Sequence, residues 1–162
     1  MPFYGLTEIG DMPETETAGD SLHADLVLDS TLASVDRGEA LVMEAAQELG
    51  FDEEVRQDIG IAVRESLVNA VAHGNRYNAR KKVLFRVWKG PGGLVIEIED
   101  QGKGFDPDEV PDPLDGENLL RHSGRGLLMI RAYMDELHYT KLQPEGTRVR
   151  MVKHLPGSSP KA

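Results

Sequence analysis

The 162-residue sequence contains no cysteine. This absence excludes disulfide bonds, thiolate metal sites and cysteine nucleophiles, and it fits a reducing compartment. No apolar run approaches the roughly 20 residues that a membrane-spanning helix needs. The N-terminus also lacks the basic and apolar regions of a secretory signal. We therefore expect a cytoplasmic protein with no membrane partner.

Basic residues are also fewer than acidic ones. The chain has 18 Lys and Arg against 28 Asp and Glu, which gives a formal net charge of -10. Proteins that bind DNA or RNA present basic surfaces to the phosphate backbone, so we expect no nucleic-acid partner. The length of 162 residues and the hydrophobic fraction of 40% predict one globular domain with a substantial core.

The two ends of the sequence are predicted to be disordered tails, over residues 1–22 and 155–162. The first tail is acidic, has no Lys or Arg and shows no apolar period. The second tail is rich in Pro, Gly and Ser. Residues 23–154 contain neither a linker nor an internal repeat, and they are predicted to form a single domain.

The first ordered elements are expected to be a strand and a helix. Residues 23–29 are typical of a strand, and apolar residues near helical spacing predict a helix over 31–49. Gly50 is expected to end this helix. Gly38 lies inside it, where glycine costs about 1 kcal/mol relative to alanine. From the sequence alone we therefore expect Gly38 to weaken the helix.

A second helix is predicted over residues 53–73, with Asp52 as its N-cap. Glu65, Asn69 and His73 are spaced i, i+4, i+8 and should lie along one side of this helix. The amide oxygen can ligate Mg²⁺, and the carboxylate can accept a proton from an attacking hydroxyl. A solvated polar face has the same spacing, so these three residues alone do not identify a site.

After the second helix the apolar period changes to two. Residues 83–88 and 94–99 alternate around a Gly-Pro-Gly-Gly turn, which predicts an antiparallel hairpin. After a segment rich in Gly, Asp and Pro, the pattern predicts a third helix and two more strands, over residues 125–136, 137–142 and 147–154. This order of elements predicts an α+β fold, a two-layer α/β sandwich with helices on one face of a mixed, mostly antiparallel sheet.

The predicted strand over residues 94–99 is followed by the motif Asp100-x-Gly102-x-Gly104. The alternation places Asp100 on the same face as Ile98, so the strand is expected to bring a carboxylate to the edge of its apolar face. A buried carboxylate needs hydrogen-bond donors, and an adenine amino group is one such donor. The two glycines remove side chains where a ligand must approach the backbone. An acidic turn that ends a strand is the alternative interpretation.

A third motif, Gly124-Arg125-Gly126-Leu127, opens the predicted third helix. Backbone N–H groups at a helix N-terminus, together with the helix dipole, form an anion site that suits a triphosphate. A flexible loop before a helix is the alternative. The pattern Gly-x-x-x-x-Gly-Lys-Ser/Thr is absent from the sequence, so the chain is not a P-loop protein.

The three motifs, in this order, resemble the GHKL (Bergerat-fold) ATPases, a superfamily that includes gyrase, MutL and sensor histidine kinases. The resemblance covers about residues 23–154, nearly the whole expected domain. Within the superfamily, the residues at 65–74, 124–130 and 134–136 are similar to those of the anti-sigma-factor serine/threonine-protein kinases.

The resemblance implies roles for four polar residues. Glu65 would be the general base, and Asn69 would ligate Mg²⁺ and bridge it to the phosphates of ATP. Asp100 would bind the adenine amino group. His73 would cap the helix end or pack near the nucleotide.

The resemblance also implies roles for glycines and loops. Gly102 and Gly104 would shape the adenine pocket, and residues 107–123 would form a mobile ATP lid. Thr147 would place a hydroxyl near the nucleotide, and the alternation puts it on the same face as Val149. The backbone N–H groups of four consecutive residues would hold the phosphates: Gly124, Arg125, Gly126 and Leu127.

Members of that family act twice, and the resemblance implies both activities here. They sequester a sigma factor, and they use ATP and Mg²⁺ to phosphorylate a serine or threonine on a STAS-fold anti-anti-sigma protein. They are usually homodimers. Phosphoryl transfer depends mainly on positioning and charge neutralisation, so the absence of a catalytic lysine is no objection.

Three alternatives remain open at this stage. The first is a nucleotide-gated protein-binding regulator of the same fold with little or no kinase activity. The second is a detached histidine-kinase catalytic domain, which the strand-like surroundings of His23 disfavour. The third is an α/β domain that binds no nucleotide, which would require three independent motifs to occur in the right order by coincidence.

Overall fold

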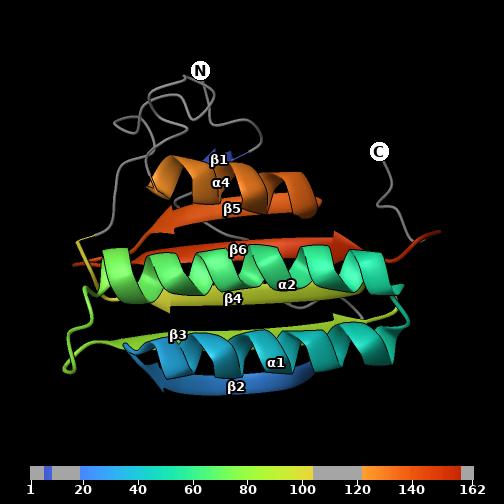
Figure 1. Cartoon of the computed structure of the whole chain (residues 1–162), viewed down its shortest axis with the longest axis horizontal. Coiled ribbons are helices and arrows are strands. Elements are labelled where there is room, and N and C mark those ends of the chain that lie inside the picture. Colours follow the sequence, from blue (N-terminus) through green and yellow to red (C-terminus); the bar gives the residue numbers. More distant parts are fainter. Residues whose placement is uncertain (1–5, 9–18, 104–121, 158–162) are drawn as a thin grey trace.

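The structure, a computed structural model, describes residues 6–8, 19–103 and 122–157. Its helical elements lie in one layer against one face of a sheet (Figure 1). They are α1 (Leu32–Leu49), α2 (Glu53–Val68), the π-helix η1 (Asn69–Gly74) and α4 (His122–Tyr133). None of the helices within the described ranges is both long and apolar enough to cross a membrane.

The second layer is a six-stranded sheet with the order β1-β5-β6-β4-β3-β2. The strands are β1 (Leu6–Glu8), β2 (Ser21–Asp29), β3 (Lys82–Gly90), β4 (Gly93–Asp100), β5 (Glu136–Lys141) and β6 (Thr147–His154). Every neighbouring pair is antiparallel except β1 and β5, which are parallel. The predicted α+β sandwich with a mixed, mostly antiparallel sheet is confirmed.

The predicted start and end of the first helix and the predicted start of the second are confirmed by their caps. The Thr31 side chain accepts a hydrogen bond from the Ser34 N–H at 3.2 Å. Gly50 ends α1 with φ 87°, a conformation that glycine adopts without steric cost. The Asp52 side chain accepts from the Val55 N–H at 2.9 Å and so caps α2.

The core lies between the helices and the sheet. Alternate residues of the strands and one stripe of each helix are buried there, as the two sequence periods predict. The largest fully buried apolar side chains include Phe85, Ile59, Leu67, Leu94, Ile96, Ile98, Ile130 and Met151. Because Ile96 and Ile98 face the core, Asp100 continues the same face toward the end of β4.

The end of the second helix differs from the prediction. The α-helix stops at Val68 and continues as a π-helix, in which the Asn75 N–H donates to the Ala70 carbonyl at 2.8 Å. This i→i+5 bond replaces the i→i+4 pattern predicted up to residue 73. The cause is tertiary, because the bonds that hold Asn75 join segments distant in sequence. Short π-helical turns are frequent at functional sites.

The start of the third helix was also predicted wrongly. Helix α4 begins at His122, three residues before the predicted start, and ends at Tyr133 rather than at residue 136. Gly124 and Gly126 favour a break on intrinsic propensity, but α4 packs against α2 and tertiary contact overrides that preference.

The N-terminal part differs from the expected tail at two places. Leu6–Glu8 forms the short strand β1, and β2 begins at Ser21 rather than at residue 23. Main-chain pairing at a sheet edge needs no apolar period, so the sequence pattern contained no signal for β1. The remaining tail predictions, over residues 1–5, 9–18 and 158–162, lie outside the described residues.

Gly38 has a packing role that the sequence analysis did not foresee, beside its expected cost to the α1 helix. A Cβ added there would lie 2.6 Å from Leu67 Cδ1 and 3.5 Å from the Phe85 ring. Both neighbours are fully buried, so neither has room to move. Because glycine has no side chain, Gly38 lets α1 lie close against α2 and the sheet.

We predict that Gly38→Ala lowers the free energy of unfolding by about 1–3 kcal/mol, the usual cost of overpacking a core. Gly60→Ala is the matched control, because its Cβ would lie 2.9 Å from Sδ of the half-buried, flexible Met43. The control should change stability by less than about 1 kcal/mol. Urea unfolding would measure both, and a Gly38→Ala protein as stable as the parent would contradict this packing account.

Candidate active site

The polar motifs meet at one end of the sandwich, on the left of Figure 1. There the C-terminal end of β4, the start of β6, the end of α2 with η1, and the start of α4 lie together. The antiparallel register of β4 and β6 places Asp100 directly beside Thr147. The ends of the two central strands, β4 and β6, therefore supply one side of the site and the helix layer supplies the other.

Glu65, Asn69 and Gly126 form one cluster. A Cβ added to Gly126 would lie 3.2 Å from Glu65 Oε2 and 3.4 Å from Asn69 Nδ2. Gly126 is buried, whereas Glu65 and Asn69 are half-buried. Two motifs about sixty residues apart in the sequence are thus in direct contact.

Asn69 Oδ1 is buried and has no hydrogen-bond partner among the described residues. An orphaned amide oxygen of this kind is costly unless a ligand satisfies it. Within residues 6–8, 19–103 and 122–157, no group of three or more His, Asp or Glu side chains could hold a metal ion. Mg²⁺ is commonly held by one or two protein oxygens together with substrate phosphates and water, so a single amide oxygen fits that cation.

Asp100 is a buried carboxylate, with 9% of the residue exposed. Its Oδ1 accepts a hydrogen bond from the Gly102 N–H at 2.9 Å. Burial raises the pKa of Asp100 to about 6, while the backbone N–H groups of Gly102 and Thr147 and the charge of Lys81 act in the opposite direction. The carboxylate is thus only partly compensated by the protein.

Thr147 and Tyr139 lie on the same side of the sheet as Asp100. Thr147 Oγ1 is buried and has no hydrogen-bond partner among the described residues. Tyr139 is also buried, and burial raises the pKa of its hydroxyl. The predicted alternation that puts Thr147 on the face of Val149 is confirmed. A ligand at this edge would meet one carboxylate and one unsatisfied hydroxyl.

Glycines allow the backbone to close around Asp100. A Cβ on Gly74 would lie 2.6 Å from Asp100 Cγ, and one on Gly146 would lie 2.5 Å from the Asp100 carbonyl oxygen. A Cβ on Gly102 would collide with the Gly74 carbonyl oxygen. The close approach predicted at Gly102 is therefore present, but the π-helix backbone makes it rather than a ligand.

His73 does not continue the predicted line of polar residues. It is exposed, whereas Glu65 and Asn69 are half-buried. The i→i+5 pattern of η1 needs more residues per turn than an α-helix, so the i+4 spacing no longer returns to the same side.

Several predicted site residues are only partly covered by the structure. Gly124 and Arg125 lie in the first turn of α4, where backbone N–H groups have no acceptor within the helix. Leu127 follows within the same helix. Gly104 and residues 107–121 of the predicted lid lie outside the described residues, so their roles stay predictions.

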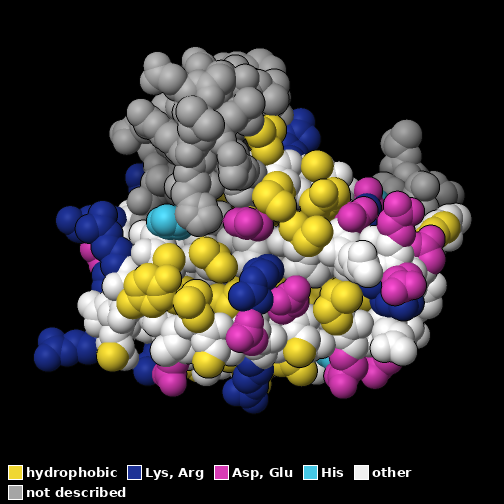
Figure 2. Space-filling view, in the orientation of Figure 1, with side chains coloured by type: hydrophobic (Ala, Val, Ile, Leu, Met, Phe, Trp, Pro, Cys, Tyr) yellow, Lys and Arg dark blue, Asp and Glu magenta, His cyan; other side chains and the backbone are white. Residues whose placement is uncertain are grey.

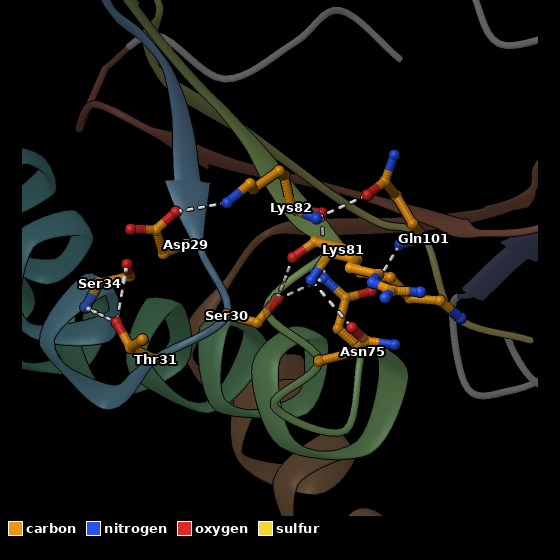
Figure 3. A network of polar contacts seen from close by, with 10 residues as sticks. Asp29, Ser30, Thr31, Ser34, Asn75, Lys81, Lys82 and Gln101 are labelled. Carbon is orange, nitrogen blue, oxygen red and sulfur yellow. Dashed lines mark hydrogen bonds and ion pairs between the residues drawn. The ribbon is translucent and has the colours of Figure 1, made fainter.

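Sequence reasoning missed Asn75, which is 2% exposed and joins four segments (Figure 3). Its Nδ2 donates to Ser30 Oγ and to the Lys82 carbonyl, both at 3.0 Å. Its Oδ1 accepts from the Gln101 N–H at 2.7 Å. No local pattern predicts these contacts, because two of the partners are 45 and 26 residues away in the sequence. Gly74 was also missed as a site residue, although it directly follows His73.

Basic side chains gather beside this site despite the acidic total charge. Figure 2 shows Lys and Arg side chains projecting at the same end of the molecule. The loop before β3 carries the exposed Arg76 and Arg80, followed by Lys81. A local positive field of this kind favours a phosphate-bearing ligand.

Comparison with known proteins agrees with this arrangement. The family model described as histidine kinase-like ATPase domain matches residues 28–153. The anti-sigma F factor of Clostridium botulinum is 35% identical over 98 residues, which are 59% of this chain and 68% of that protein. The anti-sigma F factor of Bacillus subtilis is 31% identical over 100 residues, 60% of this chain and 68% of that protein.

A kinase is among the similar proteins as well. The serine-protein kinase RsbW of Staphylococcus epidermidis is 32% identical over 108 residues, which cover 61% of this chain and 65% of that protein. The matched family model spans the helical layer, strands β3, β4 and β5, nearly all of β6, and all three motifs. The chain therefore belongs to the histidine kinase-like ATPase domain family, in the group that contains the anti-sigma F factors and the serine-protein kinase RsbW.

Proposed function

We propose that this protein is an ATP-dependent serine/threonine-protein kinase that phosphorylates a STAS-type anti-anti-sigma protein and sequesters a sigma factor. The convergence of Glu65, Asn69 and Gly126 supports the proposal most directly, because it would bring together a base, a magnesium ligand and a phosphate-binding helix. The names of the relatives, anti-sigma F factor and serine-protein kinase, support the two halves of the proposal.

The adenine base would bind where β4 ends and β6 begins, in the middle of the sheet. The Asp100 carboxylate would accept a hydrogen bond from the adenine amino group, which supplies a donor that this buried acid lacks. The Thr147 hydroxyl, which is buried without a partner among the described residues, would provide a second polar contact. Both groups project from neighbouring strands, so their separation is fixed by the sheet.

The phosphates would lie toward the helix layer. Asn69 Oδ1 would hold Mg²⁺, which when bound neutralises phosphate charge. The free N–H groups in the first turn of α4 would bind the phosphate oxygens. Gly126 lets α4 come close enough to Glu65 and Asn69 for one ligand to contact all of these groups.

Glu65 would act on the acceptor rather than on ATP. Its carboxylate would take the proton of a serine or threonine hydroxyl as that oxygen bonds to the γ-phosphorus and ADP leaves. Glu65 is half-buried and its carboxylate lies beside Gly126 of α4, where the phosphates would bind. The other residues of the site would hold the nucleotide in line for this transfer.

The remaining implications of the resemblance belong to the same proposal. A homodimer is expected, and the edge strand β2 carries Val27 and Leu22, 65% and 49% exposed, which a second copy would cover. A cytoplasmic location is also expected, since a sigma factor acts with RNA polymerase.

We predict that Glu65→Ala lowers phosphate transfer by about 100-fold or more while ATP binding is retained, because a general base contributes about that much to the rate. Radiolabelled ATP with Mg²⁺ and candidate STAS proteins of the same genome would measure transfer, and calorimetry would measure binding. Glu54→Ala, which removes an exposed carboxylate from the first turn of the same helix, is the control and should leave both unchanged.

The same experiment separates the alternatives. Tight ATP binding without label on any candidate would favour the nucleotide-gated regulator. Asp100→Ala should weaken ATP binding itself, and a chain that binds no ATP would overturn the proposal.

We predict that ATP affinity falls as the pH is lowered through about 6, the pKa of Asp100. Protonation removes the charged acceptor for the adenine amino group, whereas above this pH the carboxylate is already ionised. Asp100→Asn should remove this dependence. A wild-type affinity that stays constant between about pH 7 and about pH 5, one pH unit on either side of the pKa of about 6, would contradict the assignment.

The raised pKa of Asp100 also affects folding. Whereas ATP affinity should rise with pH, the stability of the protein without nucleotide should fall with pH. Because the unfolded chain loses its proton first, the free energy of unfolding should fall as the pH rises from about 4 to about 6. Urea unfolding of wild type and Asp100→Asn over this range would measure that contribution.

A further inference from the structure

We propose that Asn75 is a positioning residue that holds Asp100 in the orientation needed to recognise adenine, and that it thereby sets the selectivity for ATP over other nucleoside triphosphates. The inference rests on the proposed role of Asp100. Nothing in the resemblance assigns a role to this position.

The first support is the way Asn75 is bonded. Both hydrogens of its Nδ2 are donated, to Ser30 Oγ and to the Lys82 carbonyl, and its Oδ1 accepts from the Gln101 N–H. The residue is almost fully buried, so these bonds are not in competition with water. A single amide thus links the end of η1 to the end of β2, the start of β3 and the end of β4 (Figure 3).

The bond to Gln101 is the one that reaches the site. Gln101 lies between Asp100 and Gly102, whose N–H donates to Asp100 Oδ1. Fixing the Gln101 N–H fixes the peptide plane that follows Asp100, and with it the turn that aims the Gly102 N–H. Asn75 therefore acts on the orientation of the carboxylate without touching it.

A second bond reinforces the same turn. The Lys82 N–H donates to Gln101 Oε1 at 2.5 Å, while the Lys82 carbonyl accepts from Asn75. Asn75, Lys82 and Gln101 thus form a closed ring of hydrogen bonds across the start of β3 and the end of β4. The ring prevents the Asp100 turn from shifting along the sheet edge.

The backbone after Asn75 is strained. Arg76 and Tyr77 have φ values of 52° and 57°, in the left-handed region that residues with a side chain rarely adopt. Such strain persists only where surrounding bonds hold it, and here the N–H groups of Asn75 and Tyr77 donate to Ala70 and Val71. The π-helical turn and the two strained residues together place the Asn75 side chain between the strands.

Inosine triphosphate provides the appropriate probe. It carries a carbonyl oxygen where adenine has its amino group, so it presents an acceptor to the Asp100 carboxylate instead of a donor. One hydrogen bond to a charged group is worth about tenfold or more in affinity. The ratio of the dissociation constants for inosine triphosphate and ATP therefore reports whether Asp100 is correctly placed.

We predict that Asn75→Ala lowers this ratio by about threefold or more, because a mobile carboxylate distinguishes donor from acceptor less well. If Asn75 were needed only for folding, its substitution would lower the affinity for both nucleotides equally and leave the ratio unchanged. Calorimetric titration with each nucleotide, after urea unfolding has shown that the variant is folded, would measure it.

Ser30→Ala is the matched control. It removes the partner on the other side of Asn75 but leaves the bond between Asn75 and Gln101 in place. It should lower stability while the ratio stays at the wild-type value. Gln101→Ala is the second variant. It opens the hydrogen-bonded ring at the bond to Lys82, whereas Ser30→Ala leaves the ring closed, so it should lower the ratio. The Gln101 side chain is exposed, so this variant should stay folded.

The outcomes are distinct. A reduced ratio in Asn75→Ala, or in Gln101→Ala if the first variant does not fold, with Ser30→Ala unchanged, supports the inference. A wild-type protein that prefers ATP while the tested variant keeps the same ratio overturns the inference and leaves the proposed function standing. A wild-type protein without any preference for ATP overturns the adenine role of Asp100 and this inference together.

Discussion

The site depends on the burial of one carboxylate. Asp100 sits at the end of β4 with 9% of its surface exposed, and burial raises its pKa to about 6. A buried carboxylate must receive hydrogen bonds or pair with a positive charge, or else it takes up a proton and becomes neutral. The protein provides N–H donors from Gly102 and Thr147 but leaves the acid short of a full set. A ligand that brings an N–H donor to this edge therefore gains more here than at an exposed acid.

Close packing around Asp100 explains the glycines of the site. Gly74, Gly102 and Gly146 all have backbone or carboxylate atoms where a Cβ would be. The π-helix, the turn after β4 and the turn before β6 therefore lie so close together that no side chain fits between their backbones. At Gly126 the absence of a side chain lets the first turns of α4 lie close to the side chains of Glu65 and Asn69. Glycine is used here for proximity, and only Gly146 of these four also has a positive φ.

Much of this arrangement could be predicted from local patterns. Period-two alternation predicted that Asp100 and Thr147 each continue the apolar face of their strand, and the Gly50 and Asp52 caps followed from residue chemistry. The π-helix could not be predicted, since it is fixed by Asn75 bonding to segments far away in sequence. The start of α4 was misplaced for a related reason. Local propensity favours a break at its glycines, whereas contact with α2 favours a helix.

The strained segment and the buried acid suggest how nucleotide binding and folding are connected. Asp100 lowers the stability of the empty protein at neutral pH because its charged form is poorly solvated. The left-handed Arg76 and Tyr77 add a cost of about 1–3 kcal/mol each. A nucleotide that bonded to Asp100, Thr147 and Asn69 would offset the cost of burying these polar groups, since any ligand bound only by the folded state stabilises that state. Occupancy of the site should therefore rigidify η1 and the β4 turn together, because Asn75 joins them.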